Sequence, residues 1–171
     1  PAGIRAFEGA DLRASGSGDY VVITPESFTT GIQPLTDYRA AQGHTVGVVT
    51  VESIYDEFGY GVRSPEAIRE FLKYAYANWD PAPEYILLVG DTHRDCRDNL
   101  GTGKPVNVPT HLTWTPVFGE SADDMYYTRI SGDDSLPDAA LGRLTVNTEA
   151  ELEQVVNKII AYETAGLEYC W

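Results

Sequence analysis

The sequence of 171 residues has little cysteine, little lysine and no long apolar run. Its two cysteines are too few for a disulfide framework, and they lack the paired spacing typical of zinc sites. Only three residues are lysine, and 12 basic residues face 26 acidic ones, for a formal net charge of -14. Such a charge repels phosphate backbones and anionic lipids. No stretch approaches the roughly 20 apolar residues of a membrane span. We therefore expect neither nucleic acid nor membrane as a partner.

The composition otherwise suits one globular domain. Hydrophobic residues make up 43% of the chain and charged residues 22%, which is enough apolar material for one sizeable core. The acidic residues gather between Asp91 and Asp138, a concentration that suits a hard cation. A simply solvated acidic surface explains the same pattern, and both interpretations stay open.

Three β-branched apolar runs predict strands that are covered on both faces. They occupy residues 20–24, 45–51 and 85–89, and helical patterns separate them. Strands that alternate with helices pair in parallel through right-handed crossovers. The sequence therefore predicts an α/β fold, a three-layer sandwich with a doubly wound, mainly parallel sheet flanked by helices.

Helix boundaries follow from capping residues. A helix over residues 32–41 requires Pro34 to lie in its first turn, and a short turn should follow the second strand. Ser64 and Pro65 predict the start of a second helix, which ends before Pro81. Asn147 is the expected cap of the last helix. The buried stripe of that helix comprises Leu152, Val155, Val156, Ile159 and Ile160.

The middle of the chain predicts a long excursion from the sheet. Residues 92–121 are rich in Gly, Pro and Asn and contain one short strand candidate, residues 108–113. Two more short strands are expected at residues 125–130 and 139–144. The predicted domain organisation is a flexible lead-in (1–18), one α/β unit (19–164) and a tail (165–171).

Three segments resemble the N-terminal half of the gingipain-type cysteine peptidase domain. They are the strand ending in Val89-Gly90-Asp91, the run at residues 58–69, and residues 133–144 with their Gly-Arg-Leu strand. A closing helix at residues 155–163 also resembles the family, and the segments follow one another in the same order as in the family. The resemblance covers about residues 19–163. It implies a caspase-like domain of two α/β subdomains, of which the second carries the catalytic His and Cys.

This chain resembles the first subdomain only. The family's His-Gly and Ala-Cys segments are absent, because His44, His111 and Cys170 stand in other contexts. We therefore expect no catalytic residue here and no activity of the chain alone. The resemblance implies a secreted or cell-surface protein whose partner is the missing catalytic subdomain or another protein surface.

Individual residues are compatible with three other functions. His93 and Cys96 share a loop after the third strand and could in principle form a thiolate pair, although catalytic pairs usually come from separate rigid elements. Asp91 resembles the phosphoacceptor of a receiver domain, but the first strand ends without the necessary acidic pair. A protein-interaction module would use the aromatic side chains Trp114, Phe118, Tyr126 and Tyr127.

The resemblance also implies a structural calcium site. In the family, the Gly-Asp strand end and the acidic turn hold Ca²⁺, which here corresponds to the carboxylates of Asp91, Asp134 and Asp138 and the carbonyls of Ser131 and Leu136. Ca²⁺ prefers about six to eight oxygen ligands of this kind. The family often has Glu where Asp138 stands, so the carboxylate at this position of the predicted site is on a shorter side chain. The alternative is a solvated acidic turn.

Overall fold

The sheet has four parallel strands in the order β2-β1-β3-β6. The computed structural model describes residues 11–93, 95, 99–132 and 134–165. The strands are β1 (Tyr20–Thr24), β2 (Val46–Thr50), β3 (Tyr85–Val89) and β6 (Ala140–Leu144). All three pairings are parallel, with β1 between β2 and β3. The predicted parallel α/β sheet is confirmed.

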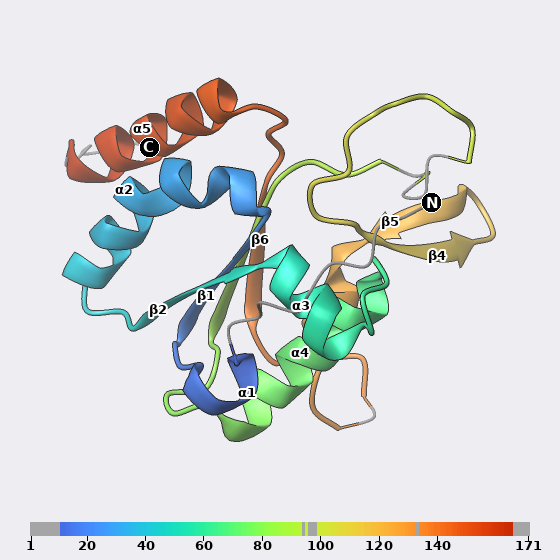
Figure 1. The fold of residues 1–171 in the computed structure, drawn as a ribbon, viewed down its shortest axis with the longest axis horizontal. Helices are drawn as coiled ribbons and strands as arrows, with labels where there is room; N and C mark the ends of the chain where they lie inside the picture. The colour runs from blue at the N-terminus through green and yellow to red at the C-terminus, as the bar shows by residue number, and fades with distance from the viewer. Residues whose placement is uncertain (1–10, 94, 96–98, 133, 166–171) are drawn as a thin grey trace.

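Helices cover both faces of this sheet and make a three-layer sandwich (Figure 1). Two long helices, α2 (Thr29–Ala41) and α5 (Glu149–Thr164), pack together on one face. The other face carries α1 (Leu12–Ser15), α3 (Val51–Phe58) and α4 (Pro65–Asn78). Alternate side chains of β1 enter two different cores, because successive strand residues point to opposite faces.

Two helix ends show how the sequence sets the boundaries. Ser64 caps α4 by accepting a hydrogen bond from the Ala67 amide at 3.2 Å, as predicted. The cap of α5 is Thr148 and not Asn147, because Thr148 Oγ1 accepts from the amide of Glu151. The Glu151 carboxylate in turn accepts from the amide of Asn147, the residue before the cap, at 2.7 Å, so cap and carboxylate satisfy two backbone amides much as in a capping box.

The segments between β1 and α4 contain more helix than the sequence predicted. A 3₁₀ turn, η1 (Glu26–Phe28), leads into α2, so Pro34 lies in the second turn and not the first. Pro34 is exposed, and the helix tolerates it on its solvent side. The turn expected after β2 is instead α3, which buries Val51 and Ile54 against the sheet. Val51 continues the β-branched run of the predicted strand, so the helical spacing that begins at this residue is not apparent from the sequence.

The excursion after β3 forms an antiparallel hairpin apart from the main sheet. Its strands are β4 (His111–Thr115) and β5 (Gly119–Asp123), so the expected strand at 108–113 begins later. The strand expected at 125–130 is wrong, because a 3₁₀ turn, η2 (Asp124–Tyr127), occupies its start. The Thr128 amide closes this turn on the Met125 carbonyl at 3.1 Å, and the ring of Tyr127 is fully buried.

The second half of the expected lead-in packs against the domain. Leu12 of α1 is only 7% exposed and belongs to the core. Gly16 lies so close to the Trp79 ring that an added Cβ would stand 2.1 Å from it. Residues 1–10, and the tail from 166 onward, lie outside the described part. Within the described residues, no helix is long and apolar enough to cross a membrane.

Candidate functional site at the carboxyl edge of the sheet

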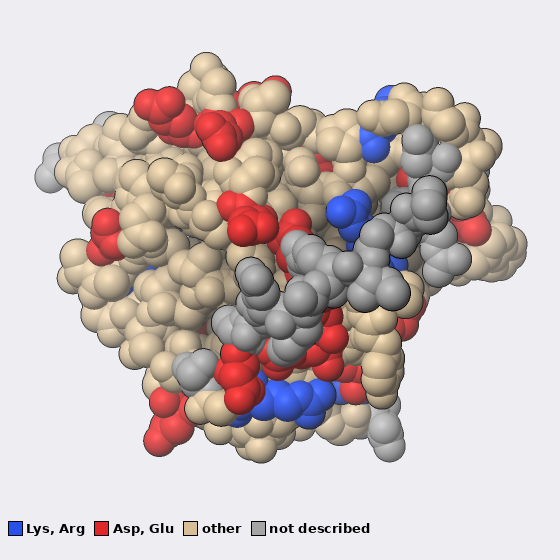
Figure 2. Space-filling model, in the orientation of Figure 1, with Lys and Arg blue, Asp and Glu red and all other residues tan. Residues whose placement is uncertain are grey.

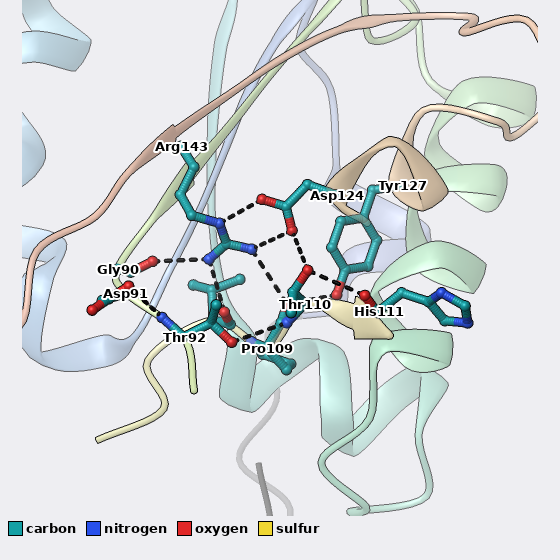
Figure 3. Close-up of polar contacts among 10 residues, drawn as sticks. Gly90, Asp91, Thr92, Pro109, Thr110, His111, Asp124, Tyr127 and Arg143 are labelled. Carbon is teal, nitrogen blue, oxygen red and sulfur yellow. Dashed lines mark hydrogen bonds and ion pairs between the residues drawn. The ribbon is translucent and has the colours of Figure 1, made fainter. Parts of the chain in front are cut away.

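A nearly buried arginine joins the long excursion to the sheet. Arg143 projects from β6, and its side chain is 8% exposed. Its Nε donates to Asp124 Oδ2 at 2.7 Å, and its Nη2 donates to Asp124 Oδ1 at 2.8 Å (Figure 3). Its Nη1 donates to the carbonyls of Gly90 at 2.9 Å and Val108 at 2.8 Å. Nη2 also reaches the Pro109 carbonyl at 3.4 Å.

These bonds engage all three guanidinium nitrogens. A buried guanidinium is costly unless its donors are satisfied, and a bidentate carboxylate compensates much of that cost. Because every nitrogen already has a protein acceptor, Arg143 has no donor left over for a substrate. We therefore interpret Arg143 as a positioning residue that fixes the excursion to the ends of β3 and β6.

The carboxylate of Asp124 completes this network. Thr110 donates its hydroxyl to Asp124 Oδ1 at 2.7 Å, besides the two bonds from Arg143. Burial alone raises the pKa of Asp124, but hydrogen bonds from Arg143 and Thr110 outweigh it, so the net pKa lies below its usual value. Asp124 therefore stays ionised and paired at neutral pH.

The Tyr127 hydroxyl fixes the same segment from the other side. It donates to the Pro109 carbonyl at 2.6 Å from a fully buried ring. Burial raises the pKa of this phenol well above its usual value, so it remains a hydrogen-bond donor. Pro109 thus accepts from both Tyr127 and Arg143 (Figure 3).

Gly90 allows the excursion to approach the end of β3. Its φ is +132°, and an added Cβ would lie 2.4 Å from the Cβ of Asn107. Asn107 donates its amide to the Asp91 carbonyl at 3.0 Å and its side chain to the Val146 carbonyl at 3.1 Å. Residues 105–109 are therefore held across the carboxyl edge of the sheet.

Two cavities border this held segment. The first, of about 300 Å³, lies between the ends of β1 and β2 and residues 105–109. The second, of about 360 Å³, is lined by Asp91, Thr92, His93, Lys104, Pro105 and Asn147. Crevices at the carboxyl ends of parallel strands are the usual ligand sites of α/β folds.

The residues predicted to bind calcium lie at opposite ends of the sheet. Asp91 follows the carboxyl end of β3, whereas Asp138 precedes the amino end of β6, and the two strands run in parallel with Tyr85 beside Ala140. At about 3.3 Å per residue, this register separates the two carboxylates by on the order of 20 Å. The five residues therefore do not fit one calcium ion.

The carboxylates of the acidic turn bind backbone amides. Asp138 Oδ2 accepts from Ile130 at 2.9 Å and from Ser131 at 2.8 Å. Asp134 Oδ1 accepts from the Leu136 amide at 3.0 Å. Across the part of the chain that the structure describes, no three His, Cys, Asp or Glu side chains come together as metal ligands. Calcium binding stays a prediction without a coordination shell.

The histidines occur at separate places, and both cysteines lie outside the described residues. His44 Nδ1 lies 2.7 Å from Asp19 Oδ2 at the amino edge of the sheet. His111 stacks on Tyr126 with ring centroids 3.8 Å apart. His93 accepts from the amide of Asp95 at 3.3 Å and borders the second cavity. The hypothesis of a His93–Cys96 pair stays untested.

The carboxylate of Asp91 is bonded to its neighbours, which disfavours the phosphoacceptor alternative. Its Oδ1 accepts from the Thr92 amide at 2.8 Å, and its Oδ2 accepts from the Asn147 side chain at 3.1 Å. A receiver domain needs further carboxylates for Mg²⁺ beside the acceptor. The described residues around Asp91 provide no such group.

Arg143, Asp124 and Gly90 organise this edge, and none of them is among the site residues predicted from the sequence. In the sequence, the Gly-Arg-Leu strand serves only as a point of resemblance to the family. An arginine within a strand of a covered parallel sheet is itself a signal, because such a charge needs buried partners. Its partner Asp124, by contrast, lies 19 residues away and has no local sequence signal.

The open parallel sheet between two helical layers, with a hairpin excursion at its carboxyl edge, defines a gingipain-type α/β domain. The structure of dimeric latent PorU from Porphyromonas gingivalis has a TM-score of 0.76 at 25% identity, covering 89% of this chain and 16% of that one. The structure of the RgpB pro- and mature domains from the same organism has a TM-score of 0.64 at 24% identity, covering 86% of this chain and 29% of that one.

Sequence comparison agrees with the fold. Gingipain R2 of Porphyromonas gingivalis is 25% identical over 147 residues, which is 86% of this chain and 17% of that protein. The model of peptidase family C25 matches residues 13–171. The chain belongs to peptidase family C25. It spans less than a fifth of the length of the gingipain relative that it matches.

Proposed function

We propose that the chain is the N-terminal, non-catalytic α/β subdomain of a gingipain-like cysteine endopeptidase and is inactive alone. The observation that carries this proposal is the nature of the carboxyl edge. α/β enzymes place their chemistry at this edge, and here its central charged group, Arg143, is saturated by structural bonds. A fixed edge of this kind supports a neighbouring catalytic subdomain.

The partner is the part of the peptidase that supplies the catalytic His and Cys. The hairpin exposes large apolar side chains, since Trp114 is 70%, Val117 80% and Phe118 82% exposed. Exposed apolar side chains gathered on one projection are typical of an interface. The edge of β6 supports the same proposal, because β3 is its only partner strand in the described sheet.

A peptidase assay tests inactivity directly. The isolated chain should give no turnover of fluorogenic Arg or Lys peptides above the buffer rate, and the Cys96→Ala and Cys170→Ala variants should match it. Thiol-dependent turnover that disappears in Cys96→Ala alone would overturn the proposal and support the His93–Cys96 pair.

A binding assay tests the role of the hairpin. We expect a gingipain-type catalytic subdomain, supplied as a separate chain, to bind the wild type, and to bind a Trp114→Ser/Phe118→Ser variant at least tenfold more weakly. The matched control is Val48→Ser, which changes an exposed apolar residue on β2, at the far edge of the sheet. Equal binding by all three proteins would exclude the hairpin as the docking surface.

We extend the proposal to a secreted or cell-surface location, on the strength of family membership. A fractionation experiment on the source cells, with an antibody against this domain, tests it. Recovery of the protein from the cytoplasm alone would contradict the proposed location.

A further inference from the structure

The cavity of about 300 Å³ lies where ligands of α/β folds are usually bound. Pro25 directly follows β1 and Val51 directly follows β2, so the carboxyl ends of both strands form its floor. Residues 105–109 provide the opposite wall. Small-molecule sites have volumes from about 300 Å³ upward and combine apolar walls with a few polar groups.

The opposite wall is rigid, so the cavity exists before any ligand arrives. Asn107 is held by the Asp91 and Val146 carbonyls, and Pro109 accepts from Tyr127 and Arg143. Between them, Val108 is fully buried. A preformed site loses little conformational entropy on binding.

Two groups of opposite charge line this one cavity. Glu52, in the first turn of α3, uses Oε2 to accept from the Glu26 amide at 3.1 Å. Its Oε1 has no hydrogen-bond partner among the residues that the structure describes, so it can accept from a ligand. Arg63 is exposed and makes no hydrogen bond or ion pair within the described residues. Acidic side chains predominate over basic ones on the face drawn in Figure 2. Arg39, Arg129 and Arg143 each pair with a carboxylate, whereas Arg63 has no carboxylate partner among the described residues.

Apolar and hydroxyl groups complete the lining. Pro25, Val51, Val106 and Pro109 supply apolar surface, and Ser27 supplies a hydroxyl group. Because the volume is at the low end for a ligand site, only a small molecule fits. A ligand that satisfies both charges must carry a cation and an anion together.

We propose that this cavity binds a short zwitterionic peptide of dipeptide size. Its ammonium group pairs with Glu52, its carboxylate pairs with Arg63, and small apolar side chains contact the proline and valine walls. This binding function is independent of catalysis and of docking to a catalytic subdomain. It also gives a role to Arg63 of the Gly-Val-Arg-Ser-Pro run, which the proposed subdomain function leaves unused.

Three probes of nearly equal size test the proposal by titration calorimetry. Alanyl-alanine carries both charges, N-acetyl-alanyl-alanine lacks the ammonium, and alanyl-alanine amide lacks the carboxylate. We expect alanyl-alanine to bind the wild type with a stoichiometry near one, and each neutralised probe to bind about tenfold more weakly, as for a lost charged hydrogen bond.

Two variants test which side chain binds the ammonium group of the probe and which binds its carboxylate. In Arg63→Gln, alanyl-alanine and its amide should bind equally; in Glu52→Gln, alanyl-alanine and its N-acetyl form should bind equally. Gln at position 52 still offers an oxygen to the Glu26 amide, which protects the fold, and Lys158→Gln on the exposed side of α5 is the matched charge control. Absence of saturable binding to the wild type, or unchanged discrimination among the probes in both variants, would overturn the proposal, whatever the outcome of the peptidase and docking assays.

Discussion

The two halves of this domain depend to different degrees on apolar burial and on polar bonds. From β1 to β3, apolar side chains such as Val21, Ile23 and Phe71 pack between sheet and helices and are fully buried. From the end of β3 to β6, only a few side chains such as Val108 and Tyr127 reach the apolar core, and the chain is held in addition by polar bonds that converge on Arg143 and Asp124. Apolar burial gives a periodic sequence pattern, whereas a convergent polar network gives none.

This difference explains what the sequence could and could not predict. The runs at residues 20–24 and 85–89 are buried on both faces, so their apolar continuity predicted parallel strands correctly. The Met125–Ile130 segment also looked like a strand, but the buried ring of Tyr127 bends it into a 3₁₀ turn. That burial depends on the distant Pro109 carbonyl, which no local pattern indicates.

The candidate site shows the same limit. Asp91 was correctly placed at a strand end, because the Val-Gly-Asp ending is a local feature. Its convergence with Asp134 and Asp138 was a long-range prediction, and the parallel register of β3 and β6 puts the acidic turn at the other end of the sheet. Spacing along the chain could not reveal which end of the sheet the turn would occupy.

The largest loss of stability should come from a substitution in the apolar half of the domain. Phe71→Ala removes a fully buried ring and should destabilise the domain by about 3–5 kcal/mol in chemical denaturation. The matched control is Phe118→Ala in the hairpin, where the ring is 82% exposed and the expected change is within about 0.5 kcal/mol. Similar losses for the two variants would contradict the division into two halves.

The next largest loss of stability should come from a substitution where the two halves meet. Gly90→Ala should cost about 1–3 kcal/mol, because the residue has φ +132° and its new Cβ would meet Asn107 at 2.4 Å. Gly142→Ala on β6 is the control, since its Cβ would make an ordinary contact with Leu87 at 3.8 Å. A Gly90 variant as stable as the Gly142 variant would show that residues 105–109 are not tightly seated.

A smaller effect should appear in how the stability of an Asp124 variant depends on pH. Because the pKa of Asp124 is lowered in the folded state, its contribution to stability is present above the unfolded pKa of about 3.9 and is lost as pH falls through the lower folded value. The melting temperature of Asp124→Asn should therefore lie below that of the wild type near pH 6, and the gap should narrow below about pH 4. Asp37→Asn on the exposed face of α2 is the control. A gap that is constant with pH would contradict the paired carboxylate.

The smallest expected difference is between calcium and chelator. Asp91→Asn weakens the bond to Asn147 and should lower stability by about 1 kcal/mol to the same extent in millimolar calcium and in excess chelator. Melting curves of the wild type, Asp91→Asn and Asp134→Asn in both buffers measure this. A calcium-dependent stabilisation of the wild type that both variants lose would instead restore the predicted five-residue site.

Hydrogen exchange of an Arg143→Met variant tests the division into two halves most directly. Methionine fills the space with an apolar chain but provides none of the bonds to Asp124, Gly90 and Val108. We predict that amides of residues 107–124 lose protection at least tenfold while those of β1 and β3 retain it, because the apolar core remains intact. Uniform loss of protection across both halves, or no loss at residues 107–124, would contradict the conclusion that this one arginine holds the excursion to the sheet.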